Sequence, residues 1–97
     1  MKNYTSTLIA FIILFHSCIG SDFTEYVPTC FNGSSFVKCP SSLTKKHQEN
    51  IEKVFSHYNI SFKKENNRIF YKGKIDDETL WNYTTKANDT MWLNSHF

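Results

Sequence analysis

An uninterrupted run of apolar residues near the N-terminus, Leu8–Phe15, most constrains what this chain can fold into. Lys2 and a short polar stretch precede the run, and the small residues Cys18 and Gly20 follow it. A positive start, an apolar centre and a small-residue exit are typical of a secretory signal peptide. The run has eight residues, whereas a membrane-spanning helix needs roughly 20. We therefore expect residues 1–20 to be a signal peptide and residues 21–97 to form a single exported domain without a transmembrane helix.

Two ways of processing this signal are open. Cleavage after Gly20 leaves small residues, Cys18 and Gly20, at positions −3 and −1 from the cut. The stretch before Cys18 also resembles the processing site of bacterial lipoproteins, in which the cysteine sulfur carries the lipid. Lipidation at Cys18 would hold the protein at the cell envelope without a spanning helix. The protein is exported under both interpretations, as a secreted or periplasmic protein or as an envelope-anchored one.

Removal or acylation of Cys18 leaves one cysteine pair, Cys30 and Cys39. In an exported protein such a pair predicts a disulfide. Closing this short loop contributes roughly 2.7 kcal/mol in the chain-entropy model, a large share of the stability of a domain with a small core. A two-residue turn at Asn32-Gly33 would give a register that conflicts with the disulfide. We therefore expect a wider loop that contains Asn32-Gly33 as a bend.

The pattern of apolar residues from Ser21 onward predicts an α+β fold in the order β-α-β-β-α, with two helices packed on a short antiparallel sheet. The first strand falls within Thr29–Cys39, and residues 21–28 are expected to form a frayed extended arm. A helix is expected over Leu43–Tyr58, capped by Ser41 or Ser42, because apolar residues recur there at helical spacing. These residues are Ile51, Val54, Phe55 and Tyr58.

Alternation of apolar and polar residues predicts two further strands, Ile60–Lys64 and Arg68–Lys72. The turn between them contains two asparagines, which tolerate positive φ. Asp76 is expected to cap a second helix. Residues 91–93 are expected to pack back on the core or to form a short strand.

The formal charge of +2 is too small for a nucleic-acid-binding footprint. The charges are unevenly distributed along the chain. Residues 38–74 hold nine basic and three acidic side chains, whereas residues 76–97 hold one basic and four acidic side chains. A basic face near the predicted hairpin suits an acidic protein, a glycosaminoglycan or an anionic lipid surface. The alternative is an ordinary solvated face, neutralised by the acidic C-terminal segment. The candidate binding residues are Lys63, Lys64, Arg68, Tyr71, Lys72 and Lys74.

The acceptor pattern for N-linked glycans, Asn-x-Ser/Thr, occurs four times after the signal peptide. It lies at Asn32, Asn59, Asn82 and Asn88. These sites indicate a glycan-coated secreted protein in a eukaryotic or viral context. The alternative is an asparagine-rich bacterial protein in which the pattern has no meaning.

Catalytic and metal-binding patterns are weak. His47 and His57 are ten residues apart, so they do not share a helix face as ligands, and their spacing from Cys30 and Cys39 lacks the short cysteine interval of structural zinc sites. The acidic run at residues 76–78 is explained by helix capping and the helix dipole. We expect no enzymatic activity, no cofactor and no metal.

These observations predict a small exported protein that acts by binding, with an acidic protein or an anionic surface as its partner and no nucleic acid. One alternative is an envelope lipoprotein with a structural or accessory role, anchored through Cys18. The other is a secreted N-glycosylated effector.

Overall fold

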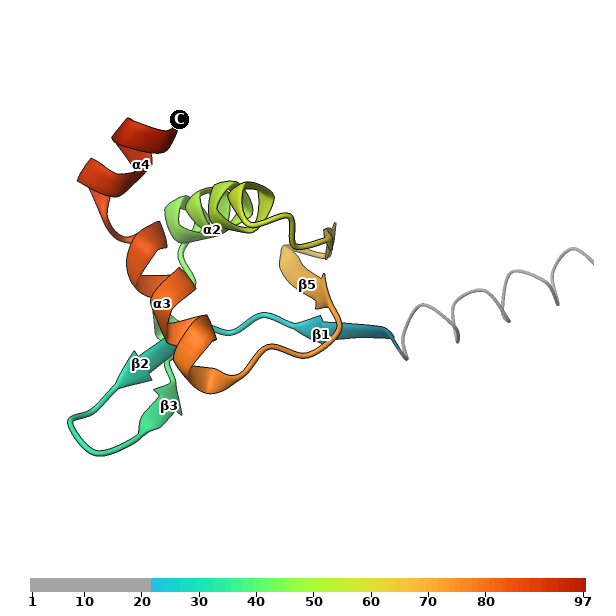
Figure 1. Cartoon of the computed structure of the whole chain (residues 1–97). Coiled ribbons are helices and arrows are strands. Elements are labelled where there is room, and N and C mark those ends of the chain that lie inside the picture. The colour runs from blue at the N-terminus through green and yellow to red at the C-terminus, as the bar shows by residue number, and fades with distance from the viewer. Residues whose placement is uncertain (1–21) are drawn as a thin grey trace, which may run out of the picture.

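The computed structural model of the protein describes residues 22–97. The predicted signal peptide, residues 1–20, and the candidate lipidation site Cys18 lie outside the described residues. The predicted α+β class is confirmed, because helices pack beside antiparallel sheets (Figure 1). In chain order the elements are β1 (Phe23–Glu25), β2 (Thr29–Phe31), β3 (Phe36–Lys38), the 3-10 turn η1 (Pro40–Ser42), α2 (Lys45–His57), β4 (Phe62–Glu65), β5 (Arg68–Lys72), α3 (Asp77–Ala87) and α4 (Thr90–His96).

One layer of the domain is a three-stranded antiparallel sheet with the order β1-β5-β4. β4 and β5 form the predicted hairpin, with β4 beginning at Phe62 instead of Ile60. Both turn residues have positive φ, 52° at Asn66 and 65° at Asn67. Asparagine reaches this left-handed region at lower cost than most other residues, so the local sequence determines the turn.

β1 corrects the expectation that residues 21–28 form a frayed arm. The strand pairs with β5, and Thr24 Oγ1 donates to the carbonyl of Gly73, 49 residues further along the chain. Tyr26, directly after β1, donates its N–H to the carbonyl of Ile69 at 2.7 Å and is completely buried. Three residues are too few for an alternation of polar and apolar side chains to identify the strand from the sequence. The strand is stabilised by its pairing with β5.

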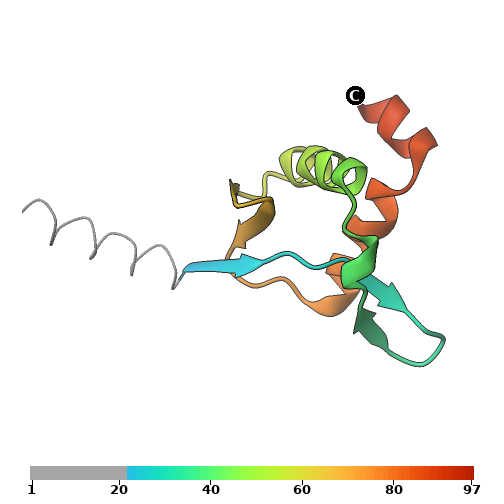
Figure 2. The same cartoon turned by 180° about the vertical axis from the view of Figure 1, so that it is seen from behind.

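β2 and β3 form a second, two-stranded sheet, which packs against Trp81 of α3 and whose loop end projects from the domain (Figures 1 and 2). The disulfide between Cys30 and Cys39 joins the two chain segments, with their Cα atoms 6.1 Å apart, which confirms the predicted bridge. The two-residue turn at Asn32-Gly33 is absent from the hairpin, because Cys30 lies opposite Val37 and Phe31 opposite Phe36. Within the loop, Asn32 N–H donates to the carbonyl of Ser35 at 3.1 Å. The side-chain oxygen of Asn32 also accepts from the N–H groups of Ser34 and Ser35, both at 2.9 Å.

α2 begins two residues later than predicted. Thr44 caps it, since Thr44 Oγ1 accepts from the N–H of His47 at 3.1 Å. The predicted caps Ser41 and Ser42 instead lie in η1, where Pro40 fixes the backbone ahead of the helix.

The chain after β5 forms two helices instead of one. Asp76 caps α3 as predicted, by accepting from the N–H of Thr79 at 3.3 Å. Asp89 caps α4 in the same way, by accepting from the N–H of Trp92 at 3.1 Å. Residues 91–93 are therefore helical, and Trp92 and Leu93 pack against the core.

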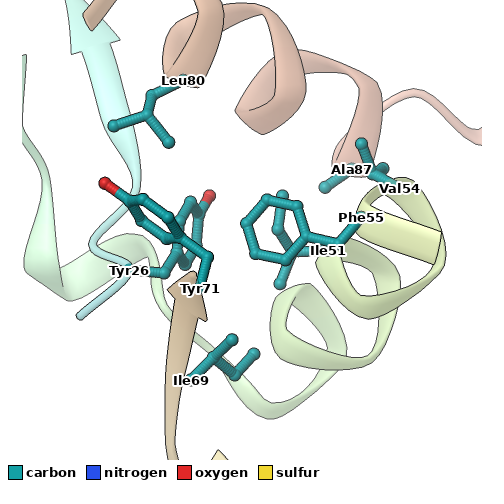
Figure 3. Close-up of a cluster of buried hydrophobic side chains, with 8 residues drawn as sticks. All are labelled: Tyr26, Ile51, Val54, Phe55, Ile69, Tyr71, Leu80 and Ala87. Carbon is teal, nitrogen blue, oxygen red and sulfur yellow. The ribbon is translucent and has the colours of Figure 1, made fainter. Parts of the chain in front are cut away.

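The core lies between the two longer helices and one side of the three-stranded sheet (Figure 3). Three of the four residues of the predicted stripe on α2 are buried in it, whereas Tyr58 is 37% exposed. No helix within residues 22–97 is long and apolar enough to cross a membrane. The buried cluster consists of Tyr26, Ile51, Val54, Phe55, Ile69, Tyr71, Leu80 and Ala87.

Candidate binding surface

The side of the β1-β5-β4 sheet that faces away from the core is a candidate binding surface. Residues paired across neighbouring strands lie on the same side of a sheet, and successive residues alternate between its sides. Phe70 lies opposite both Glu25 and Lys63, so it is at the centre of this surface. We call the surface the open sheet face. It is formed by Phe23, Glu25, Lys63, Glu65, Arg68, Phe70 and Lys72.

Two aromatic rings and one lysine form the middle of the open sheet face. Lys63 Nζ lies 4.8 Å from the ring centroid of Phe23 and 5.8 Å from that of Phe70. Cation–π contacts of this kind contribute about 0.5–1 kcal/mol each at exposed positions. Neither phenylalanine belongs to the buried cluster or to the side chains packed against it, so both rings lie on the outer side of the described chain.

Charged side chains surround this aromatic centre. Lys63 Nζ is 3.2 Å from a carboxylate oxygen of Glu65, and Arg68 Nε is 3.7 Å from one of Glu25. Exposed pairs of this kind contribute at most about 1 kcal/mol and exchange readily with water or with other ions. Lys72 makes no ion pair with another described residue.

The structure places only some of the predicted binding residues together. Lys63, Arg68 and Lys72 share the open sheet face, and Lys74 is exposed just beyond the end of β5. Tyr71 is corrected to a core residue with 3% exposure, because the alternation of β5 turns it to the inner side.

Lys64 also lies on the inner side of the sheet. It pairs with Glu52 of α2, with 3.1 Å between Lys64 Nζ and the carboxylate oxygen. It therefore does not contribute to the basic face predicted for it.

Phe23, Glu25 and Glu65 of the open sheet face are not among the predicted binding residues. Phe23 and Glu25 belong to the segment that the sequence predicts to be an arm. Phe23, Thr24 and Tyr26 belong to residue types that are frequent in strands, and this composition is the sequence signal that points to a strand at this position.

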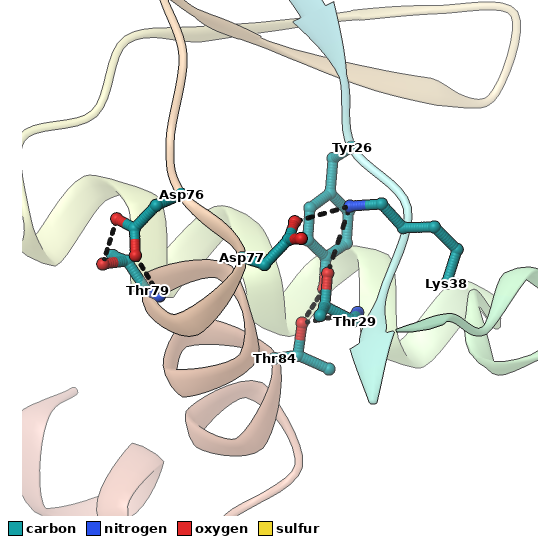
Figure 4. A network of polar contacts seen from close by, with 7 residues as sticks. All are labelled: Tyr26, Thr29, Lys38, Asp76, Asp77, Thr79 and Thr84. Carbon is teal, nitrogen blue, oxygen red and sulfur yellow. Dashed lines mark hydrogen bonds and ion pairs between the residues drawn. The ribbon is translucent and has the colours of Figure 1, made fainter. Parts of the chain in front are cut away.

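A chain of hydrogen bonds runs through the core from β2 to the end of α3. Thr29 N–H donates to Thr84 Oγ1 at 3.2 Å, and the hydroxyls of Thr84 and Tyr26 are 2.8 Å apart (Figure 4). The Tyr26 hydroxyl is also 2.8 Å from His47 Nε2, and His47 Nδ1 is 2.9 Å from Asn88 Oδ1. The contacts of Tyr26 and Thr84 are buried and the one between His47 and Asn88 is partly buried; they join segments that are 21 to 58 residues apart.

One assignment of protons satisfies every group in this network. Thr29 N–H donates to Thr84, Thr84 donates to Tyr26, Tyr26 donates to His47 Nε2, and His47 Nδ1–H donates to Asn88. Burial lowers the pKa of His47, against a smaller opposing effect of the bond to Asn88. Burial also raises the pKa of Tyr26. Both groups are therefore held neutral, as the assignment requires.

Lys38 connects the hairpin of β2 and β3 to the start of α3. Its Nζ donates to Thr29 Oγ1 at 3.3 Å and lies 3.8 Å from a carboxylate oxygen of Asp77 (Figure 4). The acidic run at residues 76–78 therefore has two structural roles, capping α3 and pairing with the hairpin.

The histidines and cysteines of residues 22–97 do not gather into one cluster. His47 is inside the hydrogen-bond network, whereas His57 packs edge-on against Trp92 and His96, with ring centroids 5.2 and 5.0 Å away. Within residues 22–97, no group of three or more histidine, cysteine or acidic side chains is placed to hold a metal ion.

Comparisons with known protein families, with curated proteins and with solved structures found no match to this chain.

Proposed function

We propose that this chain is a small exported binding protein that recognises an acidic segment of a partner protein through the open sheet face. The observation that carries the proposal is the pair of half-buried phenylalanine rings on a side of the sheet that faces away from the core of the described chain, beside three cationic side chains. A binding role needs only non-covalent contacts, and the buried hydrogen-bond network of Tyr26, His47 and Thr84 joins segments of the core.

Charge favours an acidic partner. The open sheet face together with Lys74 carries four basic side chains and two acidic ones, Glu25 and Glu65. Lys72 and Lys74 at one end of the open sheet face are exposed and make no ion pair within the described chain. A carboxylate of the partner can therefore approach them without displacing an internal acid, which improves both association rate and specificity.

The aromatic rings favour a polypeptide over a sulfated polysaccharide. An extended peptide alternates its side chains, so carboxylates and apolar groups can contact the cations and the two rings in turn. A sulfated polysaccharide presents mainly anionic groups, for which the cations alone are sufficient.

The experiment measures binding of a fluorescent peptide in which glutamate alternates with leucine, by anisotropy at low and physiological salt. Lys72→Glu/Lys74→Glu is compared with Lys45→Glu/Lys53→Glu, which changes the net charge equally on exposed α2 positions. We expect the sheet-face pair to weaken binding by about tenfold or more, and the α2 pair by less than about threefold. Phe23→Ser is expected to weaken binding as well.

Equal losses in the two charge-reversed variants would show that only the overall charge matters, and would refute the proposed surface. Binding of a sulfated polysaccharide that is insensitive to Phe23→Ser, together with no binding of the peptide, would replace the proposed ligand class. Thermal unfolding of each variant checks that the domain is folded.

A further inference from the structure

All four acceptor asparagines predicted from the sequence are exposed. Asn32 lies in the loop between β2 and β3, and Asn59 directly follows the end of α2 at Tyr58. Asn82 is on α3, and Asn88 is the residue that ends α3. No acceptor asparagine lies on β1, β4 or β5.

Within the described residues, the side-chain hydrogen bonds of three of these asparagines use the amide oxygen and not the nitrogen. Asn32 Oδ1 accepts from two backbone N–H groups, Asn82 Oδ1 accepts from the ammonium of Lys86, and Asn88 Oδ1 accepts from His47. A glycan is attached to the amide nitrogen, so it leaves these contacts intact. Asn50 provides the contrast, since it is buried, has no acceptor pattern, and donates its Nδ2–H to the carbonyl of Ala87 at 3.0 Å.

The four sites are of two kinds, which differ in whether the serine or threonine of the acceptor pattern is exposed or buried. Ser34, Ser61 and Thr90 are exposed, so the patterns at Asn32, Asn59 and Asn88 are accessible in the folded domain. The pattern at Asn82 ends at Thr84, which is 4% exposed and bonded to Tyr26 and Thr29. A transferase can therefore read the pattern at Asn82 only before the core closes.

We propose that Asn32, Asn59, Asn82 and Asn88 carry N-linked glycans, that Asn82 is modified only before folding, and that the glycans leave the open sheet face uncovered. In the reaction, the amide nitrogen of asparagine forms a bond to the anomeric carbon of a lipid-linked oligosaccharide diphosphate. The bond from that carbon to the diphosphate oxygen breaks, the lipid diphosphate leaves, and the amide nitrogen loses one proton. The last part of the proposal rests on the proposed function.

The first test uses the full chain secreted from eukaryotic cells. Peptide mass spectrometry after enzymatic glycan removal is expected to show occupancy at all four asparagines. Ser34→Ala, Ser61→Ala, Asn82→Gln and Thr90→Ala each remove one acceptor pattern and leave the structural contacts of Asn32, Asn88 and Thr84 in place, so each is expected to remove one glycan. Absence of glycan from any of the four asparagines would overturn the proposal.

The second test compares folded, unglycosylated protein with the same protein unfolded and reduced, as substrates for a purified oligosaccharyltransferase. The unfolded chain is expected to be modified at all four sites. The folded domain is expected to be modified at the three sites with exposed hydroxyls and at least tenfold less at Asn82. Equal modification of Asn82 and Asn32 in the folded domain would refute the role assigned to Thr84.

The third test concerns the open sheet face and uses the peptide probe described above. Lys72→Asn/Lys74→Thr adds an acceptor pattern on this face, and Lys72→Asn/Lys74→Ala is the matched variant without one. We expect the added glycan to weaken peptide binding by about tenfold relative to the matched variant, whereas enzymatic removal of the four native glycans changes binding by less than about threefold. A tenfold gain on removing the native glycans would overturn the idea that they leave the face open. Absence of peptide binding by the unglycosylated protein would refute the proposed function alone, because the first two tests do not depend on it.

Discussion

Removing the hydroxyl of Tyr26 tests the hydrogen-bond network that joins the two ends of the domain. Tyr26→Phe keeps the ring but takes away the oxygen that lies 2.8 Å from both His47 Nε2 and Thr84 Oγ1. An acceptor on His47 and a donor on Thr84 then remain inside a core where both residues are 4% exposed. Leaving a buried polar group unsatisfied costs about 1–3 kcal/mol, so we expect the free energy of unfolding to fall by about 2–4 kcal/mol.

That loss is large for a domain of this size. At about 0.05–0.15 kcal/mol per residue, a domain of about 75 residues has a total free energy of unfolding of roughly 4–11 kcal/mol. The melting temperature of so small a domain shifts by about 4–8 °C for each kcal/mol, so a decrease of about 10 °C or more is expected. Urea unfolding followed by circular dichroism measures the change as a shift of the midpoint at constant slope.

Tyr58→Phe is the matched control, because Tyr58 is 37% exposed. It should change the free energy of unfolding by less than about 0.5 kcal/mol. A double variant, Tyr26→Phe/Thr84→Val, is expected to lose less than the sum of the two single variants, since they share one bond. If Tyr26→Phe is as stable as Tyr58→Phe, the network does not hold the core in the way described.

Three further predictions concern stability. Cys30→Ser/Cys39→Ser should lower the free energy of unfolding by roughly 2.7 kcal/mol, measured against the unreduced wild type in urea, and an unchanged midpoint would contradict this. Because burial lowers the pKa of His47 in the folded state, the unfolded chain takes up a proton first as the pH falls below the ordinary histidine value of 6.5. Stability should therefore decrease below that pH, and His47→Gln should flatten the decrease in pH-dependent thermal unfolding. Thr44→Ala should lower the free energy of unfolding by about 1 kcal/mol, because α2 loses its cap. Ser42→Ala is the control in the same urea assay, and equal stability of the two variants would contradict the role of the cap.

The parts of the fold that the sequence predicts are those stabilised by local interactions. The helix from Lys45 to His57 follows from the spacing of its apolar residues, and the β4–β5 turn follows from two adjacent asparagines. β1 and the Tyr26 network were missed because their partners lie tens of residues away, and single-sequence periodicity contains no information on such pairs. The same limit applies to the candidate surface, where the cations were predicted but Phe23 was not.

Lys64 and Tyr71 illustrate a different limit. The alternation of the strands already separated their side of the sheet from that of Phe70 and Lys72. A prediction that groups basic residues by their position in the sequence, and not by the side of the sheet, assigns all of them to one surface. The side of the sheet that the helices cover is determined by the packing of α2 and α3.

The bond between Tyr26 and Thr84 also has a consequence for the order in which the domain folds. Tyr26 lies close to the start of the folded unit and Thr84 close to its end, so no N-terminal fragment contains a complete core. Contacts between such distant parts of a chain form late and slow the folding of small domains. A chain that crosses a membrane from its N-terminus would thus remain open until α3 has emerged. Enzymes that act on extended chains have access to every segment during that interval, including the one around Thr84 that is later enclosed.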